Sequence, residues 1–318
     1  MTPLSNKDKY RIFCQEETLI PIFMQDWWLD AVCIAGQWDV CLEEQEGKVV
    51  AAWPYYLTRT WGLPQINMPL QTKFSGPWLK YPKGLKYHSQ LAWEKEIIQK
   101  LISQLPKVVR FRENFHYGIT NWLPWHWKGF KQTTGYSYRL DQLSNLEEVK
   151  AGFNENVKRN LNKAKNQVQV VPSENIEEFI QISSLTASKR NIANNYPKQL
   201  IHNIEDQSAK RNRRLVLKAV DVENNIHAMI YLVWDNTSVY YLMSGTDERF
   251  QKSGAFVLLI WEGIQHAAKL GLAFDFEGSM IEGVEQFFRS FNAKQYPYFY
   301  VTKTDSKLIQ ILEIFDLA

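Results

Sequence analysis

The stretch that decides the fold is VYYLM at residues 239–243, followed by ERFQKSGA at 248–255 and AFDFEGS at 273–279. The first and third segments have the composition of strands, and the second begins a long helix. A further strand, YFYVTK, is predicted at 298–303. Alternating strands and helices indicate a sheet with crossover connections. The small-residue turn into the helix would expose backbone N–H groups that suit an anion.

The helix that starts at this turn has one apolar face, formed by Phe256, Leu259, Ile260, Gly263, Ile264 and Ala267. Such a face predicts packing against a sheet, which would hold the start of the helix rigid. Two strands are expected before it, at 215–222 and 227–234, joined by a tight turn at Asn224-Asn225. The second half therefore runs helix, strand, two helices, three antiparallel strands, helix, strand, helix, strand.

The first half is also expected to combine strands and helices. Helices are predicted at 18–35, at 97–105 before Pro106, and at 119–130, with strands within 38–80 and at 108–112 and 137–140. A new helix can begin after 141–146, where Ser144 or Asn145 provides a cap. We therefore predict an α/β protein with mixed sheets and two domains, residues 1–143 and 144–318.

Composition excludes several classes of protein. A net charge of +3 over 318 residues is low for a dedicated duplex-DNA binder. The three cysteines lack CxxC spacing and the histidines lack metal spacing, so neither a disulfide framework nor a metal site is expected. The start of the chain has no signal-peptide pattern, and no apolar run is long enough to span a membrane. We expect a cytoplasmic protein without a transmembrane segment.

Tryptophan is the compositional outlier, since ten of the twelve lie between Trp27 and Trp127. Large aromatic rings most often fill a core, and we favour that interpretation. The alternative is a stacking surface for a glycan or a peptide, for which WLPWHW at 122–127 is the candidate. Under this alternative the chain would be a non-catalytic binding protein.

Three segments resemble the GNAT acyltransferase superfamily, and in particular its FemAB-like branch, which adds amino acids to peptidoglycan precursors. They are FNENVKRNLNKA at 153–164, DFEGS at 275–279 and VEQFFRSFNA at 284–293. The resemblance implies tandem GNAT-like domains, an acceptor-side N-terminal domain and a C-terminal domain with the donor and catalytic cleft.

The resemblance also implies a reaction. An acyl or aminoacyl group would pass from acyl-CoA or aminoacyl-tRNA to an amine, on a small molecule or on a cell-envelope precursor. It implies neither a metal nor a tightly bound cofactor. The basic stretch 158–218 is either a solvated face or a track for the phosphates of CoA or tRNA.

The donor-binding residues are expected around the turn into the helix. The segment QKSGAF at 251–256 is similar to the GNAT pyrophosphate loop and keeps its Gln251 and Gly254, with Phe256 in place of a small residue. Ser253 and Gly254 would offer N–H groups to a phosphate, although Ser253 also fits an ordinary helix cap. Tyr241 and Ser244 would position the acyl carbonyl or the leaving group.

The catalytic candidates are Asp275, Glu277 and Arg289. The two carboxylates are two residues apart on a predicted strand, so we expect them on one face at its exit, where one accepts the proton of the amine. The alternative is a hydrogen-bonded strand end without a chemical role. By the resemblance, Arg289 corresponds to a phosphate-stabilising lysine in a Phe-Lys motif.

Three further residues are candidates for binding the acceptor. Ser279 follows the carboxylates directly. Lys73 and Ser75 belong to a loop of the first half, and they are assigned to the acceptor side by analogy of position.

Overall fold

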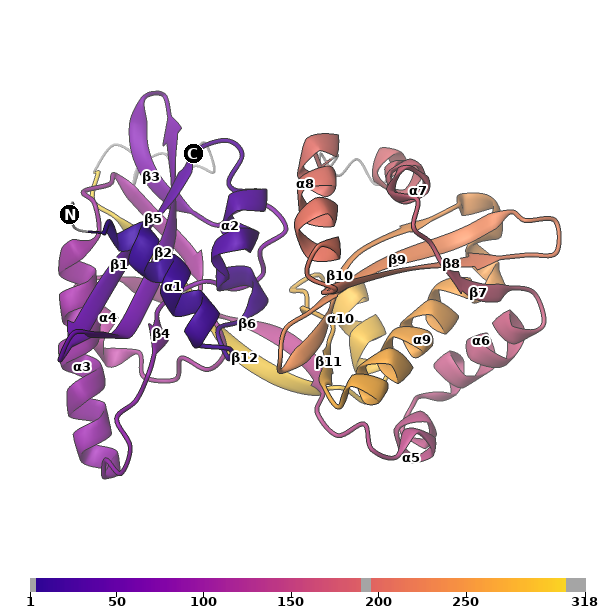
Figure 1. Ribbon diagram of the computed structural model, residues 1–318. Helices are drawn as coiled ribbons and strands as arrows, with labels where there is room; N and C mark the ends of the chain where they lie inside the picture. The colour runs from indigo at the N-terminus through magenta and orange to yellow at the C-terminus, as the bar shows by residue number, and fades with distance from the viewer. Residues whose placement is uncertain (1–3, 190–195, 307–318) are drawn as a thin grey trace. The chain divides into compact units, whose positions relative to one another are not determined.

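The computed structural model describes residues 4–189 and 196–306 (Figure 1). The chain forms two compact units. Unit 1 comprises Met1–Gly135 and Pro297–Ala318, and unit 2 comprises Tyr136–Tyr296. These units are not divided at residues 143 and 144, because the first division lies within β6 (Lys131–Leu140) and the last strand, β12 (Lys294–Thr304), returns to unit 1. Hydrophobic periodicity identifies such a strand but does not say which sheet it joins.

Unit 1 consists of α1 (Asn6–Glu16), η1 (Ile22–Met24), α2 (Asp26–Val32), β1 (Gln37–Gln45), β2 (Lys48–Thr60), β3 (Leu63–Asn67), β4 (Trp78–Leu79), α3 (Tyr87–Gln104), β5 (Arg110–Asn114) and α4 (Leu123–His126). Strands β6 (Lys131–Leu140) and β12 (Lys294–Thr304) each have residues in both units. The strands β1, β2 and β3 are antiparallel neighbours, and β4 also pairs with β2. β5 runs parallel to β3 and antiparallel to β12.

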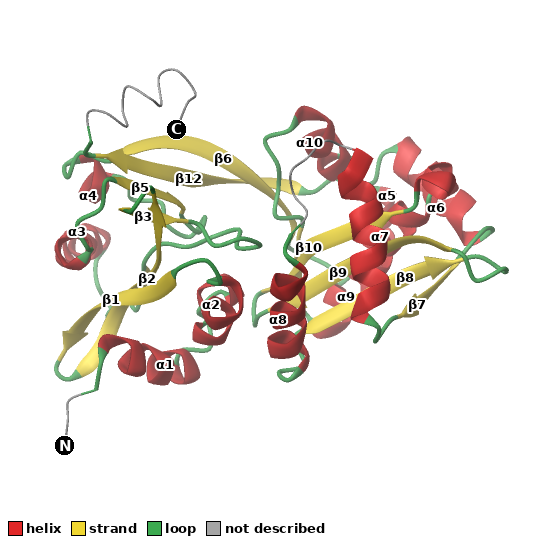
Figure 2. Ribbon diagram, turned by 90° about the horizontal axis from the view of Figure 1, so that it is seen from above, coloured by secondary structure: helices red, strands yellow, loops and turns green. Residues whose placement is uncertain are grey.

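The pleat of β1 explains why helices cover both faces of this sheet. Val40 and Leu42 point to one side and pack in a cluster with Tyr10 and Phe13 of α1. Cys41 points to the other side, into the cluster that contains Ile97 and other residues of α3. Successive side chains of a strand alternate between faces, so a single apolar run serves both layers. Figure 2 shows α1 and α3 on opposite sides of β1 and β2.

The tryptophans of unit 1 mainly fill its core, as we favoured. Trp28, Trp53 and Trp125 have no exposed surface. The segment proposed as a stacking surface, 122–127, is anchored by Trp125, whose ring lies 5.0 Å from that of Phe115. Trp127 is exposed, with the ammonium of Lys95 4.9 Å from its ring centroid.

Two predicted helices of unit 1 are wrong in extent. The helix expected at 119–130 is only the short α4, and Gly129 then adopts a left-handed φ of 78° before β6 begins. The helix expected at 18–35 is divided at Gln25, which has an extended backbone, into η1 and α2. In both cases the apolar residues are buried without completing a long helix.

Unit 2 continues with α5 (Leu146–Ala151), α6 (Glu155–Lys165), β7 (Gln169–Pro172), α7 (Ile176–Lys189), α8 (Lys198–Ala209), β8 (Arg214–Val220), β9 (Ile226–Trp234), β10 (Ser238–Thr246), η2 (Glu248–Ser253), α9 (Ala255–Leu270), β11 (Ala273–Asp275) and α10 (Glu282–Arg289). Its strands lie in the order β6, β11, β10, β9, β8, β7. Only β10 and β11 run parallel; the other neighbours are antiparallel.

Helix α9 forms the core of unit 2, as its apolar face predicted. It packs across β8, β9, β10 and β11, while α7 and α8 cover the opposite face of the sheet (Figure 1). Gly263 allows the close approach, because a Cβ there would lie 3.1 Å from both Phe274 and Leu232. The rigid base expected for the start of α9 is therefore present.

No helix among residues 4–189 and 196–306 combines the length and the apolarity needed to cross a bilayer. The same residues contain no group of three or more potential side-chain ligands for a metal ion. Cys14, Cys33 and Cys41 are free thiols.

Candidate functional site

The centre of unit 2 is the place where two parallel strands separate. Strands β10 and β11 pair from Ser238 opposite Ala273 to Tyr240 opposite Asp275, where β11 ends. β10 continues to Thr246, and its pairing with β9 shifts between Tyr241 and Met243. Such a bulge bends a strand and redirects its side chains. The second half of β10 thus has one edge that β11 does not cover.

Tyr241 and Ser244, two predicted donor-side residues, lie on this free part of β10. The bulge brings their hydroxyl groups to 2.5 Å from each other. Both side chains are partly exposed. The pair can donate or accept a proton at one point beside the separating strands.

The turn from β10 into α9 has the form expected of an anion-binding turn. Asp247 caps η2 by accepting the N–H of Arg249, and Gly254 then adopts a left-handed φ of 79° directly before α9. A Cβ on Gly254 would lie 2.5 Å from the carbonyl oxygen of Asn160 in α6. Glycine is therefore required here both for the backbone angle and for the contact with α6.

The other residues of this turn differ in their exposure. The buried hydroxyl of Ser253 accepts the N–H of Ala255, the first residue of α9, at 3.2 Å, whereas the N-cap residue of α9 is Gly254. Gln251 is exposed on η2. The ammonium of Lys163 in α6 donates to the carbonyl oxygen of Lys252, which ties the turn to the basic helix.

The exit of β11 has a different geometry from the one predicted. Asp275 is the last residue of the strand and is fully buried; it accepts the hydroxyl of Ser137 at 2.6 Å and the N–H of Glu277 at 2.8 Å. Glu277 lies beyond the strand with a left-handed φ of 60°. The expectation that alternation places both carboxylates on one strand face is therefore wrong, and Asp275 instead holds the turn that carries Glu277.

Backbone contacts also fix the residues after Glu277. Gly278 has φ of 64°, and a Cβ there would lie 2.0 Å from the carbonyl oxygen of Tyr136. The hydroxyl of Ser279 accepts the N–H of Ile281 at the start of α10. Glu277 itself is partly buried, whereas Met280 and Ile281 are exposed apolar residues. The turn is rigid at its base and ends in an apolar loop.

Arg289 lies at the end of α10 and pairs with Glu285 one turn earlier, at 2.9 Å. Glu285 also accepts the hydroxyl of Tyr138 at 2.6 Å, and these two donors lower the pKa of its carboxyl. The guanidinium of Arg289 remains 64% exposed. It is thus oriented by Glu285 and is still accessible to an anionic ligand.

An aromatic cluster links the start of α9 to β10 and α10. Phe256 stacks on Phe287 with ring centroids 5.3 Å apart, and its edge meets Tyr241 at 6.0 Å. Tyr241 also contacts Phe288. Phe256, which departs from the small residue of the family's loop, therefore forms a wall beside the bulge.

Lys73 and Ser75 belong to unit 1, whereas the residues above belong to unit 2. Ser75 is buried; its N–H donates to the carbonyl oxygen of Asn114. The ammonium of Lys73 lies 5.3 Å from the ring centroid of Tyr298, also in unit 1. Their assignment to the acceptor remains a hypothesis.

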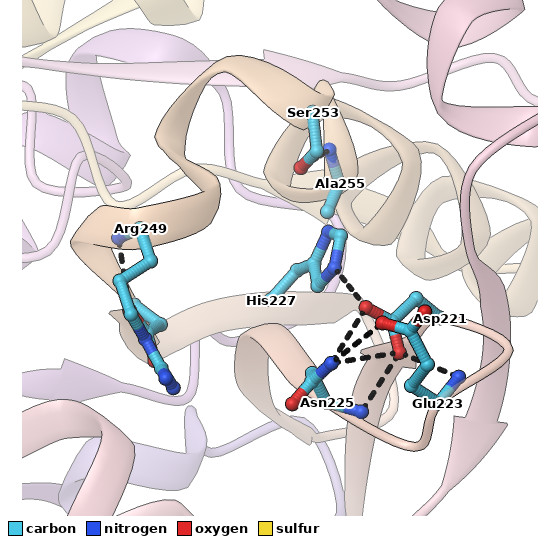
Figure 3. A network of polar contacts seen from close by, with 8 residues as sticks. Asp221, Glu223, Asn225, His227, Arg249, Ser253 and Ala255 are labelled. Atoms are coloured by element: carbon cyan, nitrogen blue, oxygen red, sulfur yellow. Dashed lines mark hydrogen bonds and ion pairs between the residues drawn. The ribbon is translucent and has the colours of Figure 1, made fainter.

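The sequence analysis missed a polar network below the turn into α9. Figure 3 shows His227 at its centre, between Asp221 and the segment that contains Ser253 and Ala255. The Asn224-Asn225 turn was predicted, and Asn224 has the positive φ of such a turn. No local signal connected that turn with η2.

Residues 151–289 match the family model described as acetyltransferase (GNAT) domain. The crystal structure of FemX is similar over 98% of this chain and 99% of its own, with 12% identity and a TM-score of 0.68. L-PGS from Bacillus licheniformis is similar over 97% and 96%, with 11% identity and a TM-score of 0.56.

A third structure, a tandem GNAT protein from the clavulanic acid biosynthesis pathway, is similar over 94% of both chains, with 10% identity and a TM-score of 0.52. No curated protein matches the chain by sequence. Identities this low show the fold alone. The fold is that of tandem GNAT-like units, which confirms the predicted fold class.

Proposed function

We propose that this chain, an acyltransferase with a GNAT acetyltransferase domain at residues 151–289, transfers an acyl group from acyl-CoA to an amine. One observation carries the proposal. A left-handed Gly254, packed against α6, starts α9 beside the point where β10 bulges and leaves β11. This arrangement supports a donor whose phosphates bind at the turn and whose acyl group lies along β10.

The start of α9 is suited to the phosphates for an electrostatic reason. The first N–H groups of a helix have no partner within the helix, and the helix dipole adds roughly half a positive charge there. Gly254 allows the close approach of α6 that fixes this turn, and Gln251 is exposed on η2. Ser253 keeps the turn in place by accepting the N–H of Ala255.

The proposed reaction uses the hydroxyl pair on β10 and the carboxylate that follows β11. The amine attacks the thioester carbonyl carbon, a C–N bond forms, and the C–S bond breaks. Glu277 accepts the proton that the amine loses, while the Tyr241 and Ser244 hydroxyl pair gives a proton to the departing thiolate. Asp275 acts on Glu277 through the bond to its N–H and is a positioning residue.

Arg289 binds an acidic group of the acceptor in this proposal. Its guanidinium is exposed and its orientation is set by Glu285. An envelope precursor that carries phosphate fits this role, and Ser279 lies in the loop that leads to α10. We place the reaction in the cytoplasm, where acyl-CoA is available; the free, largely buried thiols are compatible with that compartment.

The test is Glu277→Gln, which keeps the shape of the side chain and removes its basic oxygen. We expect kcat for amine acylation to fall by about 10²–10³-fold, as for loss of a general base, with donor KM little changed. Glu282→Gln is the matched control, because Glu282 is exposed in the first turn of α10. Mass spectrometry over a panel of amines measures the acylated product. A Glu277→Gln variant that acylates as fast as the wild type would contradict the assignment of Glu277 as the base.

A second donor, aminoacyl-tRNA, is favoured by one observation. Helix α6 carries Lys158, Arg159, Lys163 and Lys165 against a single acidic residue, Glu155, and it contacts η2. Such a basic helix beside the donor turn suits nucleic-acid phosphates as well as those of CoA. Titration with acetyl-CoA and with charged tRNA at several salt concentrations separates the two, since tRNA binding should weaken steeply with salt.

A further inference from the structure

His227 contacts both the turn between β8 and β9 and the segment η2, and the proposed chemistry does not use it. It is the second residue of β9 and only 4% exposed. Its Nε2 lies 3.1 Å from the carboxylate of Asp221 in the turn between β8 and β9 (Figure 3). A buried imidazole between two loops can transmit the position of one loop to the other.

Asp221 is itself fixed and stays ionised. It accepts the N–H groups of Glu223 and Asn225 at 3.0 and 2.8 Å, and the side-chain amide of Asn225 at 3.0 Å. These bonds, led by that of the Asn225 side chain, lower the pKa of Asp221 to about 2. A carboxylate accepts only, so His227 presents an N–H from Nε2.

On its other side His227 holds η2, the segment that ends at the donor turn. The imidazole stacks on the ring of Phe250 with centroids 3.9 Å apart and planes 4° from parallel. The N–H of Asp247 donates to the carbonyl oxygen of His227 at 3.0 Å. Asp247 in turn accepts the guanidinium of Arg249 at 2.7 Å. His227 therefore contacts η2 at two points, at its N-cap Asp247 and at Phe250 in its middle.

The second ring nitrogen of His227, Nδ1, indicates that this residue does more than stabilise the fold. Within the described residues, Nδ1 of His227 is buried and has no hydrogen-bond partner. An unpaired buried polar atom costs about 1–3 kcal/mol in proteins. A phenylalanine would stack on Phe250 equally well without that cost. The choice of histidine is better explained by the Asp221 bond and by what that bond positions.

We propose that His227 is a positioning residue for the acyl donor, which connects the Asp221 turn to η2 and so keeps the Gly254 turn ready for the donor's phosphates. The inference rests on the proposed function for its consequence in binding. Its structural part, the fixing of η2, is independent of that function. Acyl transfer itself takes place at the bulge of β10, so His227 affects donor affinity and leaves the chemical step unchanged.

The test uses His227→Phe, which keeps the stack and removes the bond to Asp221, and His227→Gln, which keeps a donor for Asp221 and removes the stack. In both variants we expect faster hydrogen exchange of the amides at 248–254. The dissociation constant for CoA, measured by calorimetry, should rise about fivefold, which corresponds to about 1 kcal/mol, with kcat at saturating acetyl-CoA unchanged. The melting temperature of His227→Phe should not fall.

Two controls define the result. Phe250→Leu removes the stack from the other side and should give the same exchange and affinity changes. His202→Phe replaces a partly exposed histidine of α8, paired with Glu177, and should change neither. Unchanged exchange at 248–254 in both His227 variants overturns the inference. Faster exchange without weaker CoA binding overturns its donor part. Failure of the wild-type chain to bind CoA at all contradicts the proposed donor and leaves the exchange result to decide the structural part.

Discussion

The two units repeat one order of elements but differ in the link between the third strand and the helix that follows it. Unit 1 runs β1, β2, β3, α3, β5, α4, and unit 2 runs β8, β9, β10, α9, β11, α10, with a parallel pair at β3–β5 and at β10–β11. In unit 2 the residues 247–254 lead directly from strand to helix through Gly254. In unit 1 the link spans 68–86 and contains β4, and the residue before α3, Lys86, has an extended and not a left-handed backbone. The same order of elements therefore contains a compact strand-to-helix turn with a left-handed glycine in only one of the two places.

The corresponding strands β5 and β11 also carry buried carboxylates with different surroundings. Glu113 of β5 lies in an aromatic core and accepts the indole N–H of Trp53 at 2.9 Å. Asp275 of β11 accepts two donors, one of them the N–H of Glu277. One carboxylate is enclosed by rings, and the other organises a turn. We infer that unit 1 has a structural role at this position and unit 2 a functional one.

The largest expected effect tests whether the tryptophans of unit 1 are core. Trp125→Ala removes a ring with no exposed surface that packs on Trp53 and Phe115, and it should destabilise unit 1 by about 3–5 kcal/mol. Trp127→Ala, on an exposed ring two residues later, should stay within about 0.5 kcal/mol. Urea unfolding measures both. If Trp127→Ala lowered the free energy of unfolding and Trp125→Ala did not, the hypothesis of a stacking surface for a glycan would be favoured instead.

The next effect concerns the junction that distinguishes the units. Gly254→Ala forces a left-handed residue and places a Cβ 2.5 Å from Asn160, so we expect a loss of about 1–3 kcal/mol. Donor KM should rise at least tenfold. Gly271→Ala, at the other end of α9, has φ of 69° and open space around its Cβ. Gly271→Ala therefore measures the effect of backbone strain alone. Equal donor KM values for the two variants would show that the Gly254 turn is not part of the donor site.

The third effect uses pH to separate the two buried carboxylates. Burial raises the pKa of Glu113 to about 8, against a smaller opposing effect of the Trp53 bond. The folded pKa lies above that of the unfolded chain. The stability linked to this proton is therefore fully present below about pH 4.5 and is lost as pH rises through about 8.

Glu113→Gln should abolish that pH dependence and be more stable than wild type at pH 9 by up to about 5 kcal/mol, since burial raises the pKa from its ordinary value of 4.5 to about 8 and each pKa unit corresponds to about 1.4 kcal/mol. At pH 4 the two proteins should differ little. Asp275→Asn is the comparison in unit 2, and it should destabilise by about 1–3 kcal/mol through the weakened bonds to Ser137 and Glu277. Denaturation midpoints between pH 4 and 9 measure both, and a Glu113→Gln protein with the wild-type profile would refute the buried acid.

Local patterns predicted what depends on local structure. The face formed by Leu259, Ile260 and Ile264 predicted α9, because a 3.6-residue period is a property of the helix itself. The turn at Ser253-Gly254 was found in the same way. The geometry at Asp275 and Glu277 was not, since β11 ends where β10 diverges, which is a property of the sheet. His227 was missed for a similar reason, because its partner Phe250 is brought to it only by the fold.

The smallest effect concerns the contact between α6 and the donor turn. The ammonium of Lys163 donates to the carbonyl oxygen of Lys252, at the surface. An exposed hydrogen bond contributes about 0.5 kcal/mol, so Lys163→Met should raise donor KM about twofold. Lys165→Met removes an exposed charge of the same helix and serves as the control for electrostatic attraction. If both variants weaken the donor equally, and the loss disappears in high salt, then α6 acts through its charge and not through its hold on the turn. That outcome would favour a polyanionic donor such as tRNA, for which a basic helix matters more than one bond to one carbonyl oxygen.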